Sequence, residues 1–340
     1  MKSSKKSWHA IARLTVENAD AEAAKAHRPK PRLVWAVCRR FGKSRVAYYD
    51  DMKRRSKRAV DEETVVRIVN EVRVDLPFLG GRKTLFLART RLREAGVRIG
   101  RDRFFDVLRR NGMLVERRRA FVPKTTRCDT SLPISTNLTR GLVVDAPNQV
   151  HVSDITYIRV GDGFAYLSLV SDRFCRDIVG WCLSPDLTAS GPVSALKMSM
   201  RVVPRGTPVI EHSDRGCQYA SRRYRRILEI LGLKSSMTEE RHCYENGAAE
   251  RVNGILKLEF ALDRRFATAE EARRAITEAV ESYNTKRPHE MLGYMTPAQA
   301  RANPDLARPA ILRAFAVAKK TSEREAEKRR RAEEAGRRAA

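Results

Sequence analysis

Two stretches of the sequence decide the fold: TPVIEHSDRGCQYAS at 207–221 and SMTEERHCYENGAAERVNGILKLEF at 236–260. The first predicts a short buried strand that ends at a polar loop carrying Asp214. The second predicts the end of a strand followed by a helix that carries Glu250. A third acid, Asp154, lies inside the strand-like run QVHVSDITYI. Three carboxylates on two strands and a helix can hold a pair of divalent cations, and such a pair can drive in-line attack on a phosphodiester.

Each acid also has an ordinary explanation when it is considered alone. Turn chemistry accounts for Asp214 in its SDRG turn, and Glu250 is a favourable acid for the first turn of a helix. Asp154 is harder to explain in this way, because it interrupts an apolar strand where an unpaired charge is costly. The case for a joint site therefore depends on the sequence around the three acids.

Charge is distributed unevenly along the chain, whose formal net charge is +27. Residues 1–140 hold 35 lysines and arginines against 15 acids, whereas residues 141–260 hold 15 against 14. A basic front half favours a nucleic-acid partner, although basicity alone would also fit simple solubility. The six cysteines form no CxxC pair, which indicates reduced thiols of a cytoplasmic protein. No signal peptide and no apolar run of about 18 residues is visible, so we expect no membrane association.

Four blocks of sequence carry a family resemblance: PNQVHVSDITYI at 147–158, HSDRGCQYAS at 212–221, the stretch 236–260, and YNTKRPHEMLGYMTPAQA at 283–300. A single Asp-Asp-Glu triple would be weak evidence, but these blocks cover most of residues 143–300 in the family's order and spacing. The chain resembles a bacterial insertion-sequence transposase of the two-reading-frame type. The similarity is to the catalytic, OrfB-like part, which has a retroviral-integrase-like core.

The resemblance implies an α/β fold with a ribonuclease-H-like catalytic core, which is a mixed five-stranded sheet with helices. The sequence pattern agrees, because three β-rich runs within 149–183 predict an antiparallel meander. Helix, strand, helix, short strand and helix are predicted in that order over 193–260. The first and fourth strands are neighbours in such folds, which would bring Asp154 and Asp214 together. One position departs from the family pattern: His151 stands where relatives usually have tryptophan, which would alter the packing around this strand.

The implied catalytic and metal-binding residues are Asp154, Asp214 and Glu250. Oxygen ligands suit Mg²⁺, for which Mn²⁺ can substitute. We assign Asp154 as the carboxylate shared by two ions, with Asp214 and Glu250 each completing one site. The freed 3′-hydroxyl would later replace water as the nucleophile, so no covalent enzyme intermediate is needed. No nucleotide cofactor is expected either, because GRKT at 81–84 lacks the earlier glycine and the preceding strand of a phosphate-binding loop.

Basic and amide side chains near the triad are candidates for DNA contact. Lys257 follows Glu250 by seven residues, nearly two helical turns, so both project from one face. The family pattern has a basic residue at Lys257, so we expect it to bind a phosphate, although a surface ion pair is the ordinary role of a helical lysine. Asn253 lies on a similar face and is expected to hydrogen-bond DNA. Arg215 and Arg287 are further candidates in polar turns.

The segment before the core predicts small helical modules. A short helix, a turn at Gly42 and a helix capped by Ser44 form a helix-turn-helix-like pattern, although plain helix packing gives the same pattern. A second unit at 61–113 ends in the basic helix RDRFFDVLRR and is similar to the helix-turn-helix segment that precedes the core in these transposases. A helical spacer is the alternative. The arginines expected to contact DNA, from this helix and the linker after it, are Arg101, Arg103, Arg109, Arg110, Arg117, Arg118 and Arg119.

These patterns give a domain organisation with five parts. The expected parts are a basic arm with a short helix-turn-helix-like segment at 1–60, a helical DNA-binding domain at 61–113, a basic linker at 114–146, the catalytic core at 147–300, and a charged C-terminal helix or tail at 301–340. The linker could follow a phosphate backbone or serve as a solvated hinge.

The leading hypothesis is a transposase that binds the ends of its insertion element and catalyses Mg²⁺-dependent strand cleavage and 3′-hydroxyl strand transfer. One alternative is a nuclease of the same fold that only hydrolyses, and another is a DNA-binding repressor with an inert core. The expected partners are double-stranded DNA, as terminal repeats and as target, and further copies of the chain, because two ends must be held at once. The expected location is the cytoplasm, with binding to the nucleoid.

Overall fold

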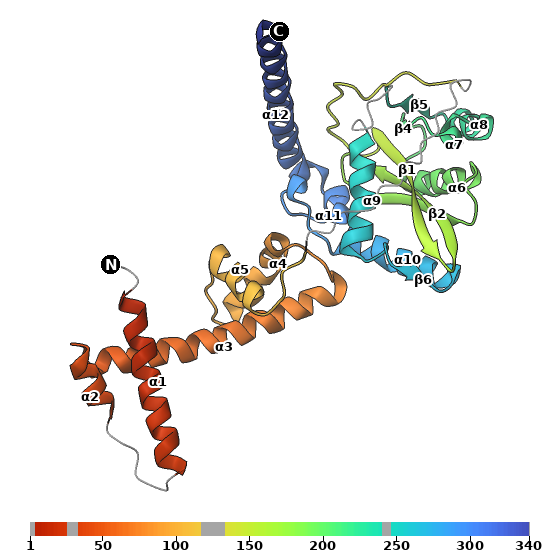
Figure 1. Cartoon of the computed structure of the whole chain (residues 1–340). Coiled ribbons are helices and arrows are strands. Elements are labelled where there is room, and N and C mark those ends of the chain that lie inside the picture. The colour runs from red at the N-terminus through yellow and green to blue at the C-terminus, as the bar shows by residue number, and fades with distance from the viewer. Residues whose placement is uncertain (1–3, 26–32, 117–132, 240–245, 340) are drawn as a thin grey trace. The chain divides into compact units, whose positions relative to one another are not determined.

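The computed structural model describes the backbone of residues 4–25, 33–116, 133–239 and 246–339 (Figure 1). The chain divides into two compact units. The helical unit comprises Met1–Asn70 and Ala88–Met113, and the sheet unit comprises Glu71–Leu87 and Leu114–Ala340.

The helical unit begins with α1 (Ser4–Lys25), α2 (Leu33–Arg40) and α3 (Arg45–Asp75). The predicted turn between α2 and α3 is present. Gly42 has a φ of 60°, which favours glycine, and the Ser44 hydroxyl caps α3 by accepting a hydrogen bond from the Ala47 N–H at 3.2 Å. Residues 1–30, expected to be a loose arm or one marginal helix, contain the 22-residue helix α1.

Helix α3 is longer than the sequence pattern predicts. Two helices with a boundary at residue 60 are expected, whereas one helix of 31 residues runs through this point. The segment contains no glycine or proline, so nothing interrupts its backbone hydrogen bonds. Helix α4 (Gly81–Glu94) follows, and α5 (Arg101–Arg110) coincides with the predicted basic helix RDRFFDVLRR.

The sheet unit confirms the predicted α/β fold. Strands β1 (Val150–Val160), β2 (Gly163–Asp172) and β3 (Ile178–Ser184) form the antiparallel meander. Strands β4 (Ile210–Ser213) and β5 (Lys234–Met237) continue the sheet in parallel with β1. The order is β3-β2-β1-β4-β5, and the two-residue strand β6 (Arg265–Phe266) also pairs with β1. The first and fourth strands are therefore neighbours, as predicted.

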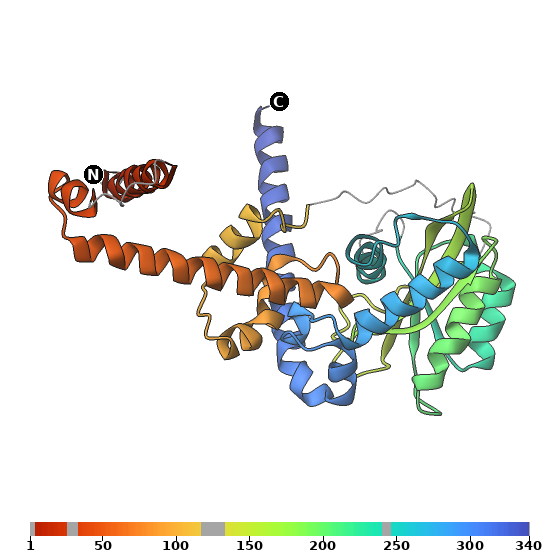
Figure 2. The same cartoon turned by 90° about the horizontal axis from the view of Figure 1, so that it is seen from below.

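Helices cover both faces of this sheet (Figures 1 and 2). On one face lie α6 (Ser190–Ser199), which leads into the short 3-10 helix η1 (Met200–Val202), α7 (Cys217–Ala220) and α8 (Arg222–Ile230). On the other face lie α9 (Gly247–Glu259) and α10 (Ala269–Thr285).

Side chains of β1 alternate between the two cores. Ile155 packs with Tyr224 of α8, whereas Ile158 packs with Leu256 of α9. Successive residues of a strand point to opposite faces, so Asp154 lies on the same face as Ile158, where α9 is found.

The first part of the C-terminal segment packs against the sheet through Leu292, Ala300, Ala307 and Ile311. The 3-10 helix η3 (Glu290–Leu292), α11 (Pro297–Ala302) and the 36-residue helix α12 (Pro304–Ala339) follow α10. The charged tail, expected to be a helix or disordered, is helical. Among the described residues, no helix combines the length and the apolar character that crossing a membrane requires.

The described part of the expected linker lies against the sheet. The Leu138 N–H donates to the Ser236 hydroxyl of β5 at 2.9 Å, and the hydroxyls of Ser135 and Ser235 lie 2.7 Å apart. These hydrogen bonds fix residues 135–138 beside β5, so this part of the linker is not a solvated hinge. Residues 117–132 of the linker lie outside the described residues.

Candidate active site

The parallel pairing of β1 with β4 brings the two catalytic aspartate candidates together. Val152 lies opposite His212 in the register of the two strands, and two further residues lead to Asp154 on one strand and to Asp214 just after the other. Neighbouring strands are separated by about 4.8 Å. Burial and the negative charge of Asp214 raise the pKa of Asp154 to about 7. The two carboxylates therefore share one electrostatic environment.

Two asparagine amides fasten α9 to β1. The Asn246 Nδ2 donates to the Ser153 carbonyl oxygen at 3.1 Å, and the Asn253 Nδ2 donates to the Asp154 Oδ2 at 2.7 Å. These asparagines are seven residues apart and so lie on one face of the helix. Glu250 stands between them in the first turn of α9, which places it close to the aspartates.

Glu250 completes the group from the exposed end of α9. Burial and the charge of Asp214 raise the pKa of Glu250, and Glu250 in turn contributes to the raised pKa of Asp154. Among the described residues Glu250 has no hydrogen-bond partner, so its exposed side chain can change rotamer without breaking a bond.

The loop after β4 orients Asp214. Burial raises the pKa of Asp214, while the Gly216 N–H, which donates to its Oδ1 at 2.9 Å, favours the ionised form. A Cβ at Gly216 would lie 2.9 Å from this same oxygen, so any larger residue here would displace the Asp214 carboxylate.

Lys257 lies within electrostatic reach of Asp154. Burial lowers the pKa of its ammonium group, and the negative charge of Asp154 opposes this shift. Its contact with a phosphate remains a prediction.

The other expected DNA contacts near the triad have partners within the protein. Asn253 is buried and uses its amide to hold Asp154, so it positions the carboxylate. The Arg215 Nε donates to the Thr238 carbonyl oxygen at 2.7 Å. Arg287 is only 1% exposed and binds both oxygens of Glu259, at 2.8 and 2.7 Å. A duplex cannot reach such a side chain, so the structure corrects Arg287 from a DNA contact to a structural residue.

The expected DNA-contacting arginines of α5 all form ion pairs in the helical unit. The pairs are Arg101 with Asp102, Arg103 with Asp61, Arg109 with Asp106, and Arg110 with Glu62. These pairs are solvent-exposed, and exposed pairs contribute little to stability. Arg117, Arg118 and Arg119 lie outside the described residues.

Sequence reasoning missed four arginines on α8. Arg222, Arg223, Arg225 and Arg226 form no ion pair among the described residues, and three of them are exposed. The signal was present as the run RRYRR, in which Tyr224 faces the core and the arginines surround it. Tyr219 was also missed. Its buried hydroxyl has no partner among the described residues, and burial together with nearby negative charges, including Asp154 and Asp214, raises its pKa.

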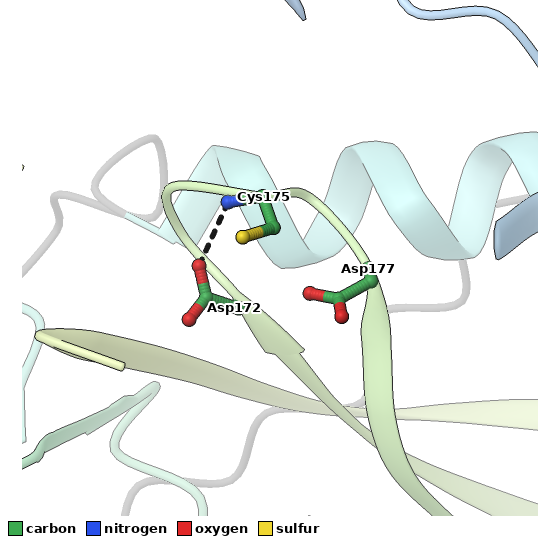
Figure 3. Close-up of side chains that lie close together, drawn as sticks. All are labelled: Asp172, Cys175 and Asp177. Carbon is green, nitrogen blue, oxygen red and sulfur yellow. Dashed lines mark hydrogen bonds between the residues drawn. The ribbon is translucent and has the colours of Figure 1, made fainter. Parts of the chain in front are cut away.

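A second acidic group lies at the β2–β3 turn. Among the described residues, the one set of three potential metal ligands whose ligand atoms all lie within 4.8 Å of one another is Asp172, Cys175 and Asp177 (Figure 3). The side-chain oxygens of Asp154, Asp214 and Glu250 do not all lie within 4.8 Å of one another. The like charges of these three acids repel one another.

Asp172 and Asp177 nevertheless serve a structural role, because both form ion pairs with Arg301. The Asp172 Oδ1 accepts from the N–H groups of Phe174 and Cys175 at 2.7 and 2.8 Å. The Arg301 guanidinium binds both oxygens of Asp177 and lies 3.4 Å from the Asp172 Oδ2. Burial raises the pKa of the Cys175 thiol far above its usual range, so the thiol is neutral and a poor ligand. Arg301 therefore supplies the cation of this group.

Comparisons with known proteins agree with this architecture. An integrase core domain family matches residues 144–243, and a second integrase core domain family matches residues 231–297. The Insertion element IS600 uncharacterized 31 kDa protein of Shigella sonnei is 34% identical over 270 residues, which cover 78% of this chain and 97% of that protein. Transposase InsF for insertion sequence IS3A of Escherichia coli (strain K12) is 36% identical over 194 residues, which cover 56% of this chain and 67% of InsF.

Solved structures give weaker similarities. The HTLV-2 integrase catalytic core domain in complex with magnesium aligns with a TM-score of 0.37 and 20% identity, over 45% of this chain and 96% of that chain. A chain of the simian T-cell lymphotropic virus intasome in complex with PP2A regulatory subunit B56 gamma aligns with a TM-score of 0.41 and 17% identity, over 66% of this chain and 75% of that chain. The family assignment rests on the sequence relatives. The chain therefore belongs to the family of insertion-sequence transposases with an integrase-type DDE catalytic core, which are polynucleotidyl transferases.

Proposed function

We propose that this transposase binds the ends of its insertion element and carries out Mg²⁺-dependent DNA cleavage and 3′-hydroxyl strand transfer at Asp154, Asp214 and Glu250. One observation carries the proposal. The β1–β4 pairing and the docking of α9 on β1 gather three acids from distant parts of the sequence into one electrostatic site.

The residues present fit a divalent metal. All three candidate ligands are carboxylates, whose hard oxygens suit Mg²⁺ and also Mn²⁺. Burial is the largest cause of the raised pKa of Asp154, and the negative charges of Asp214 and Glu250 add to it. Asp154 interacts with both other acids and is therefore the ligand to be shared by two ions. Ions bound there would activate the nucleophile and neutralise the charge that develops on the phosphate.

The chain's own side chains prepare this site for DNA. The amide of Asn253 holds the Asp154 carboxylate, and the Gly216 N–H holds that of Asp214, so both ligands are oriented before metal binds. Lys257 lies on the same helix as Glu250, where its ammonium can bind the phosphate next to the cleaved bond.

DNA binding extends beyond the active site in this proposal. The exposed ion pairs of α5 can exchange an internal carboxylate for a phosphate at small cost. The unpaired arginines of α8 can meet a phosphate directly. The partners are duplex element ends, a duplex target and further copies of this chain, which together hold two ends. The proposed location is the cytoplasm, on the nucleoid.

The products formed from labelled element-end DNA test this function. With Mg²⁺ we expect both nicked ends and strand-joined products, and the Glu250→Gln variant should give neither while still binding the ends. Nicks without joined products in the wild type would instead support a nuclease. End binding without either product would support a repressor and contradict the proposal.

A further inference from the structure

Three adjacent strands place ionisable side chains in one row of the sheet. Two of these side chains stand three residues before the proposed catalytic aspartates Asp154 and Asp214. In the strand register, His151 of β1 lies opposite Asp172 of β2 and opposite Glu211 of β4. All three side chains are at most 2% exposed. The His151 Nε2 lies 3.9 Å from the Asp172 Oδ2, and the His151 Nδ1 lies 4.0 Å from the Glu211 Oε2. One imidazole thus stands between two carboxylates.

Asp172 is well supplied with hydrogen-bond donors, whereas one oxygen of Glu211 has none among the described residues. The Asp172 Oδ2 accepts from the Asn148 N–H at 2.6 Å. The Glu211 Oε1 accepts from the hydroxyls of Ser153 and Tyr224. Three buried atoms have no partner among the described residues, namely both ring nitrogens of His151 and the Glu211 Oε2. Buried polar atoms are rarely left unpaired, because each costs its full desolvation energy.

One additional proton would satisfy all three atoms. A neutral imidazole has one N–H donor and one acceptor nitrogen. If Nε2 carries the hydrogen, it can donate to Asp172, and Nδ1 then needs a donor, which Glu211 provides only when its Oε2 is protonated. Transfer of that proton to Nδ1 gives an imidazolium that donates to both carboxylates. The two states contain the same number of protons.

Without that additional proton, neither tautomer of His151 gives a hydrogen-bond partner to both of its ring nitrogens. If Nδ1–H donates to ionised Glu211, the bare Nε2 faces the Asp172 carboxylate. If Nε2–H donates to Asp172, the bare Nδ1 faces the Glu211 carboxylate. In either case two acceptors oppose each other in a buried site, which is unfavourable.

We propose that Glu211 and His151 share one proton and, with Asp172, form a buried hydrogen-bonded bridge across β4, β1 and β2. Closing it requires each ring nitrogen and its oxygen to approach by about 1 Å. The bridge fixes the pairing of β1 with β4, on which the positions of Asp154 and Asp214 depend. His151 and Glu211 are therefore positioning residues, and only this effect on catalysis rests on the proposed function.

The surroundings favour the proton on Glu211. Burial raises the pKa of Glu211 to about 7 and lowers that of His151 to about 4. The other ionisable groups that face the pair are Asp172, Arg301, Tyr219 and Tyr224. A carboxyl pKa raised on folding contributes stability that is complete below its unfolded value and is lost as pH rises to about 7. The bridge should weaken over the upper part of this range.

The Glu211→Gln variant is the sharpest probe. Its amide oxygen can still accept from Ser153 and Tyr224, and its NH₂ group can donate to the His151 Nδ1, so it imitates protonated Glu211 at every pH. Glu229→Gln is the matched control, because Glu229 is an exposed acid on α8. Glu211→Leu removes the donor and leaves Nδ1 without a partner.

The ¹⁵N chemical shifts of the ring nitrogens in the full chain, labelled at its six histidines, report the bridge without any need for DNA. The His151→Phe variant assigns the His151 signals. We expect His151 to remain the neutral Nε2–H tautomer at pH 5.5 and to show a step near pH 7, which Glu211→Gln abolishes and Glu229→Gln preserves. A His151 that titrates near pH 6.5, as an exposed histidine does, or a step that survives in Glu211→Gln, would overturn the proposal.

DNA cleavage then tests the positioning role separately. We expect Glu211→Gln to cleave within about twofold of the wild type and Glu211→Leu to lose at least tenfold. Because the NMR result does not depend on cleavage, an inactive wild type would count against the proposed function and leave the bridge standing. Equal cleavage by Glu211→Leu and wild type would overturn the positioning role.

Discussion

The sheet unit contains two groups of carboxylates, and among the described residues only one of them is neutralised by a basic side chain of the protein. Asp172 and Asp177 lie close together and are neutralised by Arg301, which reaches them from α11. Asp154, Asp214 and Glu250 are spread more widely, and burial together with the negative charges of the other two raises the pKa of Asp154 to about 7. The comparison teaches that close packing of acids does not identify a metal site. What matters is whether the protein supplies its own cation.

The largest expected difference between the two groups is in catalysis. Asp154→Asn should lower the rate of DNA cleavage by at least about a thousandfold, because it removes the ligand that we propose is shared by both ions. Asp177→Asn should leave the rate per folded molecule close to that of the wild type. Gel analysis of cleaved element ends gives both rates. Similar losses in the two variants would remove the distinction between the groups.

The second largest expected effect is on the free energy of unfolding, and it concerns the group formed by Asp172, Asp177 and Arg301. Arg301→Met leaves two buried carboxylates without their cation and should lower the free energy of unfolding by about 3 kcal/mol. Arg308→Met is the control, since Arg308 pairs with the exposed Asp305 and should change the free energy by less than about 1 kcal/mol. Urea unfolding at neutral pH measures both values. Equal changes would show that Arg301 does not neutralise the buried acids.

Magnesium should stabilise the protein through the triad alone. A ligand present at about 100 times its dissociation constant stabilises the folded state by about 2.7 kcal/mol. We expect Mg²⁺ to raise the unfolding temperature of the wild type and of Asp177→Asn, but not that of Asp154→Asn or Asp214→Asn. Thermal unfolding with Mg²⁺ and with EDTA provides the measurement. If Mg²⁺ no longer stabilised the Asp177→Asn variant, the metal would bind at Asp172 and Asp177, which would contradict the assignment to the triad.

The smallest expected effect concerns pH. Asp154 must lose its proton to bind metal, and its pKa is raised to about 7, so Mg²⁺ affinity should fall by about tenfold for each pH unit below 7. In the absence of Mg²⁺, stability due to this group should be complete below its unfolded pKa and decline as pH rises to about 7. Calorimetric Mg²⁺ titrations and urea unfolding from pH 5 to 8 measure these trends. Affinity independent of pH would contradict the shifted pKa.

Much of the fold could be predicted from local patterns. The three strands of the meander and helix α5 follow from the spacing of apolar residues and from turn residues, which act over short distances. Helix α3 was predicted as two helices, one in each of the modules at 1–60 and 61–113. Its backbone hydrogen bonds run through residue 60 because neither glycine nor proline interrupts them.

The partners of individual side chains could be predicted much less well. Asn253 has the spacing of a DNA contact, yet it binds Asp154, which is 99 residues away in the sequence. Arg287 stands in a polar turn, yet it is buried against Glu259. Local sequence does not reveal such pairings, because they depend on which elements pack together.

The sequence by itself predicted the order of strands and helices in the core, because periodicity is a property of the chain, and the family resemblance of its motifs singled out the three acids that we propose for the site. Only the tertiary structure decided which charges are neutralised. Arg301 meets Asp177 across 124 residues, and His151 meets Glu211 through strand pairing. A charge in a folded protein is governed by its neighbours in space, and those neighbours exist only after the chain has folded.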